Sequence, residues 1–437
     1  MQSSLTKRDL CHIWHPCTQM KDHETLPLLE VISASGCYLQ LADNRKMLDA
    51  ISSWWCKSLG HQHPHIKRAV KLQLEKFEHV MLAGTTSDVI VTLSEQLATL
   101  MPSLNKVLYA GDGSSAVEMA LKLSLHAQQI TGKPKRTKFL SLKNSYHGET
   151  SGAMSVSDLG IYRDAYAAML FEAEFIAVPY VSDENVIGWH DSEWHWRSVE
   201  SHLETITDSI AAVIVEPIVQ GAGGMRIYSK DFLRRLQQWA CQHEIYLIAD
   251  EIMTGLGRTG KMLACEHAGI EPDFLCLSKG LTSGWLPFSV TLTQQKIYDL
   301  FYGDYAAGKS FLHSHTYSGN ALAASAASAT LNIIKNENIV ERAKVLGVNM
   351  RREMQRIVND TELLHNVRGI GAIVAADIVD TGQARAGVQV CQEAIRQGVL
   401  LRPLGNTIYW LPPLIMSDAE LEQLASVTRS ALITTLK

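Results

Sequence analysis

The stretch IYLIAD, residues 245–250, decides the fold of this chain. It is a short apolar run that ends at a carboxylate, and a second run, Phe274 to Leu277, ends just before Lys279. Short apolar runs separated by helical patterns are typical of parallel strands that are buried on both faces. The sequence therefore predicts an α/β fold with a mostly parallel central sheet covered by helices. Further candidate strands are Lys106 to Ala110, Phe139 to Leu142 and Ala211 to Val215.

The charged residues after the two runs suggest a chemistry. Lys279 comes 29 positions after Asp250, the length of one strand-to-strand crossover. Ligands of open α/β sheets bind at the carboxyl ends of the strands, so both side chains could face one crevice. Pyridoxal phosphate needs a lysine amine to take its aldehyde and an acid to keep its ring nitrogen protonated. The pair supplies both groups.

A glycine-rich turn offers a site for the phosphate of such a cofactor. Gly113 and Ser114 open a helical pattern, so backbone amides, a helix dipole and a hydroxyl are available there. A rival interpretation is a dinucleotide fingerprint, because Gly111, Gly113 and Ala116 match its spacing. That fingerprint needs an acidic residue about twenty positions further on, and residues 119–148 contain none. We rank the dinucleotide interpretation well below the pyridoxal-phosphate interpretation.

Composition excludes several classes of protein. A formal charge of −5, from 40 basic and 45 acidic residues, gives no reason to expect nucleic acid as a partner. The first twenty residues lack an apolar signal core and no later run could cross a bilayer, so we expect a cytoplasmic protein without membrane contact. The eight cysteines are scattered and are expected to be reduced thiols.

The order of patterns also suggests a division into domains. The candidate strands lie mid-chain, and a small-residue helical stretch from Asn320 to Thr330 precedes a charged helical segment. We expect an N-terminal segment (1–60) that lines the active site and packs with the small domain. A large cofactor-binding α/β domain (61–330) and a small C-terminal α+β domain (331–437) complete the division.

Four motifs together resemble the class III, fold type I aminotransferases, and the likeness runs from end to end. They are LIADEIMTGLGRTG (247–260), LSKGLTSG (277–284), YHGET (146–150) and HTYSGN (315–320). The resemblance implies an aminotransferase that uses pyridoxal phosphate and forms a homodimer with active sites at the interface. It assigns catalytic roles to Lys279, Asp250 and Tyr146, whose ring stacks on the cofactor. Cofactor contacts would be Gly113, Ser114, Tyr146, Asp250 and Lys279, with His315 and Thr316 reaching the partner's phosphate.

Four more segments resemble a biotin-synthesis branch of the family: HIWHP (12–16), SSWW (52–55), EPIVQGAGGM (216–225) and RPLGNTIYWLPP (402–413). The resemblance implies S-adenosylmethionine as amino donor and 8-amino-7-oxononanoate as acceptor. Ala222 stands where ornithine-type relatives carry a glutamate, which argues against glutamate–ornithine exchange. The implied substrate contacts are Trp54, Tyr146, Lys279, Ser314, Arg402, Tyr409 and Cys17.

Trp54 is chosen over Trp55 because adjacent residues of a strand face opposite ways. Cys17 replaces a tyrosine of this branch, Ser314 and His315 replace Gly-Pro, and Glu149 replaces an aspartate. These departures fall in the substrate shell and leave the donor open, with lysine a possible alternative. His61, His63 and His65 lack a spaced second set of ligands, so no metal site is expected.

Three other functions stay open on the sequence. Another ω-amine or diamine transaminase would share the chemistry. A ligand-binding protein could keep the fold without turnover, and a nicotinamide-dependent oxidoreductase would use the glycine-rich turn.

Overall fold

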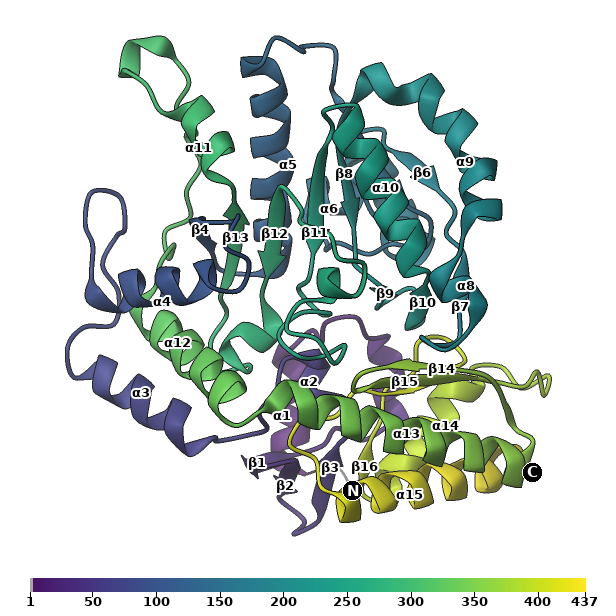
Figure 1. Ribbon diagram of the computed structural model, residues 1–437. Coiled ribbons are helices and arrows are strands. Elements are labelled where there is room, and N and C mark those ends of the chain that lie inside the picture. The colour runs from purple at the N-terminus through teal and green to yellow at the C-terminus, as the bar shows by residue number, and fades with distance from the viewer. Residues whose placement is uncertain (1–2) are drawn as a thin grey trace.

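A seven-stranded sheet forms the centre of the computed structural model, which describes residues 3–437 (Figure 1). Its strand order is β4-β13-β12-β11-β8-β5-β6. The strands from β12 to β6 run parallel, whereas β13 is antiparallel to both of its neighbours. This confirms an α/β fold with a mostly parallel sheet. The bounds are β4 Lys106–Ala110, β5 Lys138–Leu142, β6 Glu174–Ile176, β8 Ile210–Val215, β11 Tyr246–Asp250, β12 Phe274–Leu277 and β13 Ser289–Thr293.

Helices cover both faces of this sheet. On β11, Ile248 packs in a cluster with residues of α5 (Gly113–Ile130), whereas Leu247 and Ala249 pack with residues of α10 (Lys230–Gln242). Alternate side chains of a strand face opposite ways, so Asp250 leaves the sheet on the same side as Ile248. The side chain of Asp250 is therefore directed toward α5.

The five predicted strands are all present, with bounds that differ by at most one residue at an end. The sequence reasoning missed β6 and the antiparallel β13. In β13, Ser289 and Thr291 interrupt the apolar pattern, although the whole strand is buried. Their hydroxyls donate to the carbonyls of Asp112, which caps α5, and of Ala116 in its first turn. These polar residues belong to the sheet because α5 supplies their hydrogen-bond acceptors.

Three small sheets accompany the central one. In the first, β16 pairs in parallel with β3, so the N-terminal strands share a sheet with residues near position 400. The other small sheets are β7-β10-β9 and β14-β15-β17. The bounds are β1 Val31–Ser35, β2 Tyr38–Leu41, β3 Lys46–Asp49, β7 Tyr180–Val181, β9 Val219–Gln220, β10 Arg226–Tyr228, β14 Leu364–Ile370, β15 Ile373–Ile378, β16 Val399–Leu400 and β17 Thr407–Trp410.

The small-residue stretch forms α12, which is continuous across position 330, so the domain boundary there stays a prediction. No described helix is long and apolar enough to cross a membrane. The remaining helices are α1 Ser4–His12, α2 Ser52–Trp55, α3 Pro64–Leu74, α4 Asp88–Ala98, α6 Ser151–Ser155, α7 Gly160–Arg163, α8 Ile187–His190, α9 Glu193–Ile206, α11 Gln295–Phe301, α12 Ala321–Asn336, α13 Ile339–Thr361, α14 Ala386–Arg396 and α15 Asp418–Leu436.

Candidate active site

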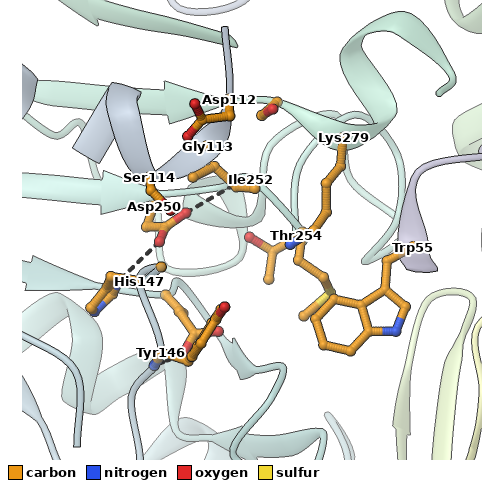
Figure 2. Close-up of a pocket in the computed structure, with 14 residues that line it drawn as sticks. Trp55, Asp112, Gly113, Ser114, Tyr146, His147, Asp250, Ile252, Thr254 and Lys279 are labelled. Atoms are coloured by element: carbon orange, nitrogen blue, oxygen red, sulfur yellow. Dashed lines mark hydrogen bonds and ion pairs between the residues drawn. The ribbon is translucent and has the colours of Figure 1, made fainter. Parts of the chain in front are cut away.

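A cavity of about 220 Å³ lies at the carboxyl ends of β11 and β12. Asp250 at the end of β11, Lys279 just after β12, and Gly113 and Ser114 at the start of α5 all line it (Figure 2). The structure thus brings together the predicted pair and the predicted phosphate turn. Tyr146 lines the same cavity.

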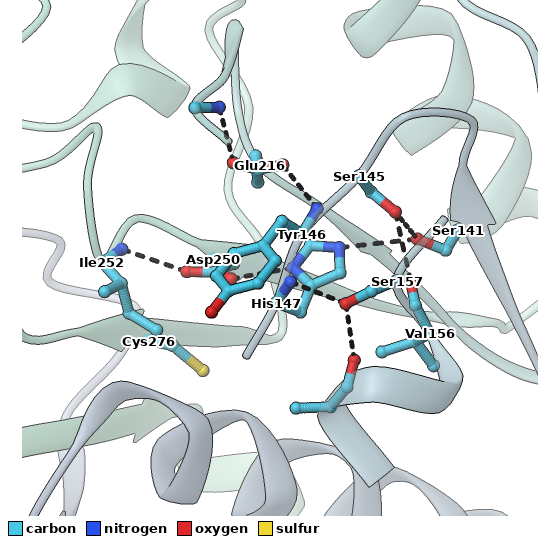
Figure 3. Close-up of polar contacts among 12 residues, drawn as sticks. Ser141, Ser145, Tyr146, His147, Val156, Ser157, Glu216, Asp250, Ile252 and Cys276 are labelled. Carbon is cyan, nitrogen blue, oxygen red and sulfur yellow. Dashed lines mark hydrogen bonds and ion pairs between the residues drawn. The ribbon is translucent and has the colours of Figure 1, made fainter. Parts of the chain in front are cut away.

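A buried histidine fixes the carboxylate of Asp250. Nδ1 of His147 lies 2.8 Å from one carboxylate oxygen, and the amide of Ile252 donates to the other at 3.1 Å. The amide of His147 in turn donates to the hydroxyl of Ser157 at 2.9 Å (Figure 3). Asp250 is therefore held in one orientation while it lines the cavity. His147 belongs to the YHGET motif (146–150), but no role was predicted for it.

Lys279 has a left-handed backbone conformation and an amine with a lowered pKa. Its φ is 42°, in the left-handed region, directly after β12. Burial lowers the pKa of the Lys279 amine, against the opposing charges of Asp250, Glu216 and Cys56. Its Nζ lies 4.9 Å from the centre of the Trp55 ring. A lysine with a lowered pKa is a better proton acceptor near neutral pH.

The start of α5 is built to accept an anion. Asp112 caps the helix by accepting from the amide of Ser115 at 2.9 Å, and the first-turn amides of Gly113 and Ser114 have no acceptor inside a helix. A Cβ on Gly113 would come within 2.9 Å of Ile252, and one on Gly148 within 2.1 Å of the Ser114 hydroxyl. Close packing therefore requires glycine at both positions, and it brings Ile252 and the 146–150 segment against the start of α5, where the free amides can bind a phosphate.

Glu216 is a second buried acid in the cavity, and sequence reasoning gave it no role. Its carboxylate accepts the amides of Tyr146 at 3.0 Å and Gly221 at 2.8 Å. Burial is the main cause that raises the Glu216 pKa to about 7, while His147 lowers it and Asp250 raises it. Glu216 thereby fastens the segment that carries Tyr146 and His147 to the loop after β8.

Trp54 and Trp55 lie on a left-handed turn, which corrects the expectation that only Trp54 faces the site. Ser52, Ser53, Trp54 and Trp55 all have positive φ, between 44° and 74°. The strand assumed for this segment is absent, so the alternation argument does not hold. Trp55 lines the cavity, whereas Trp54 is exposed and lies under the guanidinium of Arg402.

The buried carboxylate of Asp49 holds this turn. It accepts the amide of Ser53 at 3.0 Å and the Ser53 hydroxyl at 2.8 Å, and Nε2 of His61 lies 2.9 Å away. Each left-handed residue other than glycine costs about 1–2 kcal/mol. The contacts of Asp49 help to offset that strain.

Tyr409 lies in the core next to Trp55. It is 2% exposed, lies in β17 and does not line the cavity. Its hydroxyl accepts Nε1 of Trp55 at 3.0 Å. Tyr409 thereby supports Trp55 from the core, and its predicted contact with substrate stays a prediction.

Several polar residues next to Tyr146 extend the site beyond the cavity. The Tyr146 hydroxyl donates to Glu149 at 2.9 Å, and Sγ of Cys17 lies 3.9 Å from that carboxylate. Arg402 donates to the carbonyl of Cys17 at 2.8 Å, and its guanidinium lies 4.5 Å from the Trp54 ring centre. Arg402 forms no ion pair with any residue in the range 3–437. Its charge is therefore free for a ligand carboxylate.

The segment with Ser314, His315 and Thr316 does not line the chain's own cavity. Ser314 and Thr316 are exposed, and the ring nitrogens of His313 and His315 lie 2.9 Å apart. Its predicted contacts with a partner subunit and with substrate stay predictions. Within the described residues no cluster of three or more histidine, cysteine, aspartate or glutamate side chains could hold a metal.

A family model described as aminotransferase class-III matches residues 19–432. The chain belongs to the class-III aminotransferase family. A Helicobacter pylori protein named adenosylmethionine-8-amino-7-oxononanoate aminotransferase is 40% identical over 426 residues, 97% of this chain and 96% of that protein. The chain described here also matches solved structures of aminotransferases. A Methanocaldococcus jannaschii enzyme of the same name has a TM-score of 0.92 at 33% identity and 99% coverage of both chains.

A PLP-bound amine transaminase from an uncultivated Pseudomonas species has a TM-score of 0.90 at 32% identity, over 97% of this chain and 99% of that one. These likenesses confirm the predicted fold type I architecture and the class of enzyme. The aminotransferase family, for which pyridoxal phosphate is the implied cofactor, replaces the dinucleotide interpretation of the glycine-rich turn.

Proposed function

We propose that this aminotransferase moves an amino group from S-adenosylmethionine to 8-amino-7-oxononanoate, forming 7,8-diaminononanoate for biotin synthesis. The observation that carries the proposal is the single cavity in which Asp250, Lys279 and the start of α5 meet. The choice of substrates is supported by the relatives from H. pylori and M. jannaschii, which bear the name of this reaction.

Pyridoxal phosphate is the cofactor in this proposal, and the residues present fit it. Gly113, Ser114 and Gly148 line the cavity, so a phosphate there can bind the free first-turn amides of α5. Asp250 would hold a protonated ring nitrogen, and the Lys279 amine would take the aldehyde. When bound, the cofactor supplies an aldehyde that accepts the donor's amino group and a ring that accepts electrons.

The protein's own residues then perform three tasks. The Lys279 amine, whose pKa burial lowers, removes the donor's α-proton at Nζ and later returns a proton to the acceptor carbon. Asp250, oriented by His147, would pair with the protonated ring nitrogen. Tyr146 covers one side of the cavity, and Glu216 holds its backbone in place.

Arg402 and Trp54 form the proposed carboxylate site. Both substrates carry a carboxylate, and an unpaired guanidinium binds such a group with two parallel hydrogen bonds. Trp54 lies against the guanidinium and limits its movement. Ala222 brings no acid to the glycine-rich loop where ornithine-type relatives carry one, in line with these substrates.

The proposal includes a cytoplasmic homodimer in which Ser314, His315 and Thr316 of one subunit reach the partner's active site. In support, this segment is largely exposed and the neighbouring Leu312 and Tyr317 are 84% and 65% exposed. Domains 1–60, 61–330 and 331–437 remain part of the same proposal.

Lysine is the second candidate donor. Glu149 has an exposed carboxylate that lies beside Cys17. Cys17 stands where this branch of the family carries a tyrosine. The Glu149 carboxylate can pair with the second ammonium group of lysine as well as with the sulfonium of S-adenosylmethionine.

The test is a spectral titration of the cofactor-loaded enzyme with S-adenosylmethionine, lysine, ornithine and glutamate in turn. We expect S-adenosylmethionine to bleach the cofactor's visible band, and 8-amino-7-oxononanoate to restore it. Bleaching by lysine alone would move the assignment to the lysine-dependent reaction. Bleaching by glutamate or ornithine alone would refute both.

A further inference from the structure

Thr254 has a buried hydroxyl without a partner. It lies four residues after Asp250, in the loop that follows β11, and its side chain is 0% exposed. Its Oγ1 has no hydrogen-bond partner anywhere in residues 3–437. Buried polar side chains are nearly always paired, so an unpaired one calls for an explanation.

Other buried threonines of the chain satisfy their hydroxyls internally. Thr282, Thr291 and Thr330 donate to backbone carbonyls at 2.7 Å, 2.8 Å and 2.8 Å. Thr254 differs from them because it lines the cavity, and Figure 2 shows it between Asp250 and Lys279. The unpaired hydroxyl therefore belongs to the wall of the binding site.

The position of Thr254 favours the cofactor over the substrate as its partner. Asp250 and Lys279, which line the same cavity, are residues that the proposed function places around the cofactor. Arg402 and Trp54, which form the proposed carboxylate site, do not line this cavity. Pyridoxal phosphate offers phenolic and phosphate oxygens, which are strong acceptors for a threonine hydroxyl.

We infer that the Thr254 hydroxyl donates a hydrogen bond to an oxygen of bound pyridoxal phosphate. This inference rests on the proposed function and adds a cofactor contact to it. A hydroxyl reserved for the cofactor contributes to the loaded enzyme and little to the fold of the empty one.

The test compares three variants of the full-length chain. Thr254→Val keeps nearly the same shape and loses the hydroxyl, while Thr254→Ser keeps the hydroxyl. Thr330→Val is the matched control, since it removes a buried threonine hydroxyl that is paired inside α12. Each apoprotein is titrated with pyridoxal phosphate, without substrate, by quenching of tryptophan fluorescence. The melting temperature of each is measured with and without the cofactor.

We expect Thr254→Val to bind pyridoxal phosphate about 10- to 100-fold more weakly, which is the net worth of one hydrogen bond to a charged oxygen. The melting temperature of its apoprotein should match the wild type, and Thr254→Ser should bind within about twofold of it. Thr330→Val should lower the melting temperature in both states and leave the affinity unchanged.

Equal affinity in the wild type and Thr254→Val would overturn the inference, as would a loss of apoprotein stability like that of Thr330→Val. A wild-type protein that takes up no pyridoxal phosphate would instead refute the proposed function. The two failures are thus distinguishable.

Discussion

The Nδ1 atom of His147 lies 2.8 Å from a carboxylate oxygen of Asp250, and both side chains are buried. Within residues 3–437 the carboxylate of Asp250 has two hydrogen-bond partners, His147 and the amide of Ile252, so the loss of one should be measurable. His147→Ala removes one of the two contacts that orient the carboxylate and should weaken binding of pyridoxal phosphate. A hydrogen bond to a charged group is worth about 1.5–3 kcal/mol, and the free energy of unfolding should fall by a similar amount.

His147→Asn is the matched control, because its side-chain amide can place a donor near the position of Nδ1. It should recover most of the affinity in the same fluorescence titration. Equal losses in His147→Ala and His147→Asn would show that the ring packs in the core without orienting Asp250.

The left-handed turn of residues 52–55 can be tested through Asp49, which does not itself line the cavity. Asp49→Asn puts an amide where Asp49 now receives four hydrogen bonds, from the Ile51 and Ser53 amides, the Ser53 hydroxyl and His61. We expect a loss of about 1–3 kcal/mol in the free energy of unfolding. The KM for the donor should rise, because Trp54 and Trp55 lose their support.

Asp43→Asn makes the same substitution at an exposed ion pair with Arg45 and should leave stability nearly unchanged, because exposed ion pairs contribute little. Thermal unfolding and steady-state kinetics measure both variants. A normal KM in a destabilised Asp49→Asn enzyme would contradict a positioning role for this carboxylate.

The pH dependence of stability tests the environment of Glu216. Its pKa is raised from 4.5 to about 7 in the folded protein, chiefly by burial. Between these two values the folded chain holds a proton that the unfolded chain has lost, so stability falls as pH rises. From pH 5 to pH 8 the contribution of this group should fall by about 3 kcal/mol.

Glu216→Gln cannot ionise and should lack that part of the pH dependence. Chemical denaturation of the two apoproteins at pH 5 and pH 8 measures the difference. Glu251, whose pKa burial also raises to about 7, is present in both proteins and cancels. Identical pH profiles would mean that Glu216 stays ionised throughout.

Arg402→Lys tests the carboxylate site. Lysine keeps the charge but loses the planar fork that binds a carboxylate with two hydrogen bonds. We expect the KM for the donor to rise about 10-fold or more, with cofactor affinity unchanged. An unchanged KM would place the substrate carboxylate elsewhere.

Local sequence patterns were sufficient to predict Asp250 and Lys279, because each follows a strand whose apolar run is visible. The start of α5 was predictable for the same reason. His147, Glu216 and Thr254 were not assigned, since their roles arise only when segments far apart in the chain meet. The prediction that Trp54 rather than Trp55 faces the cavity was wrong because no local sequence pattern predicts four successive left-handed residues. Asp49 and His61 hold that turn through tertiary contacts.

The most direct test of the central claim is reduction of the cofactor-loaded enzyme with borohydride, followed by peptide mass mapping. We predict one pyridoxyl phosphate adduct per chain, on the peptide that contains Lys279. Lys279→Ala should fold normally, carry no adduct and have no transaminase activity. An adduct on another lysine, or full turnover by Lys279→Ala, would contradict the account.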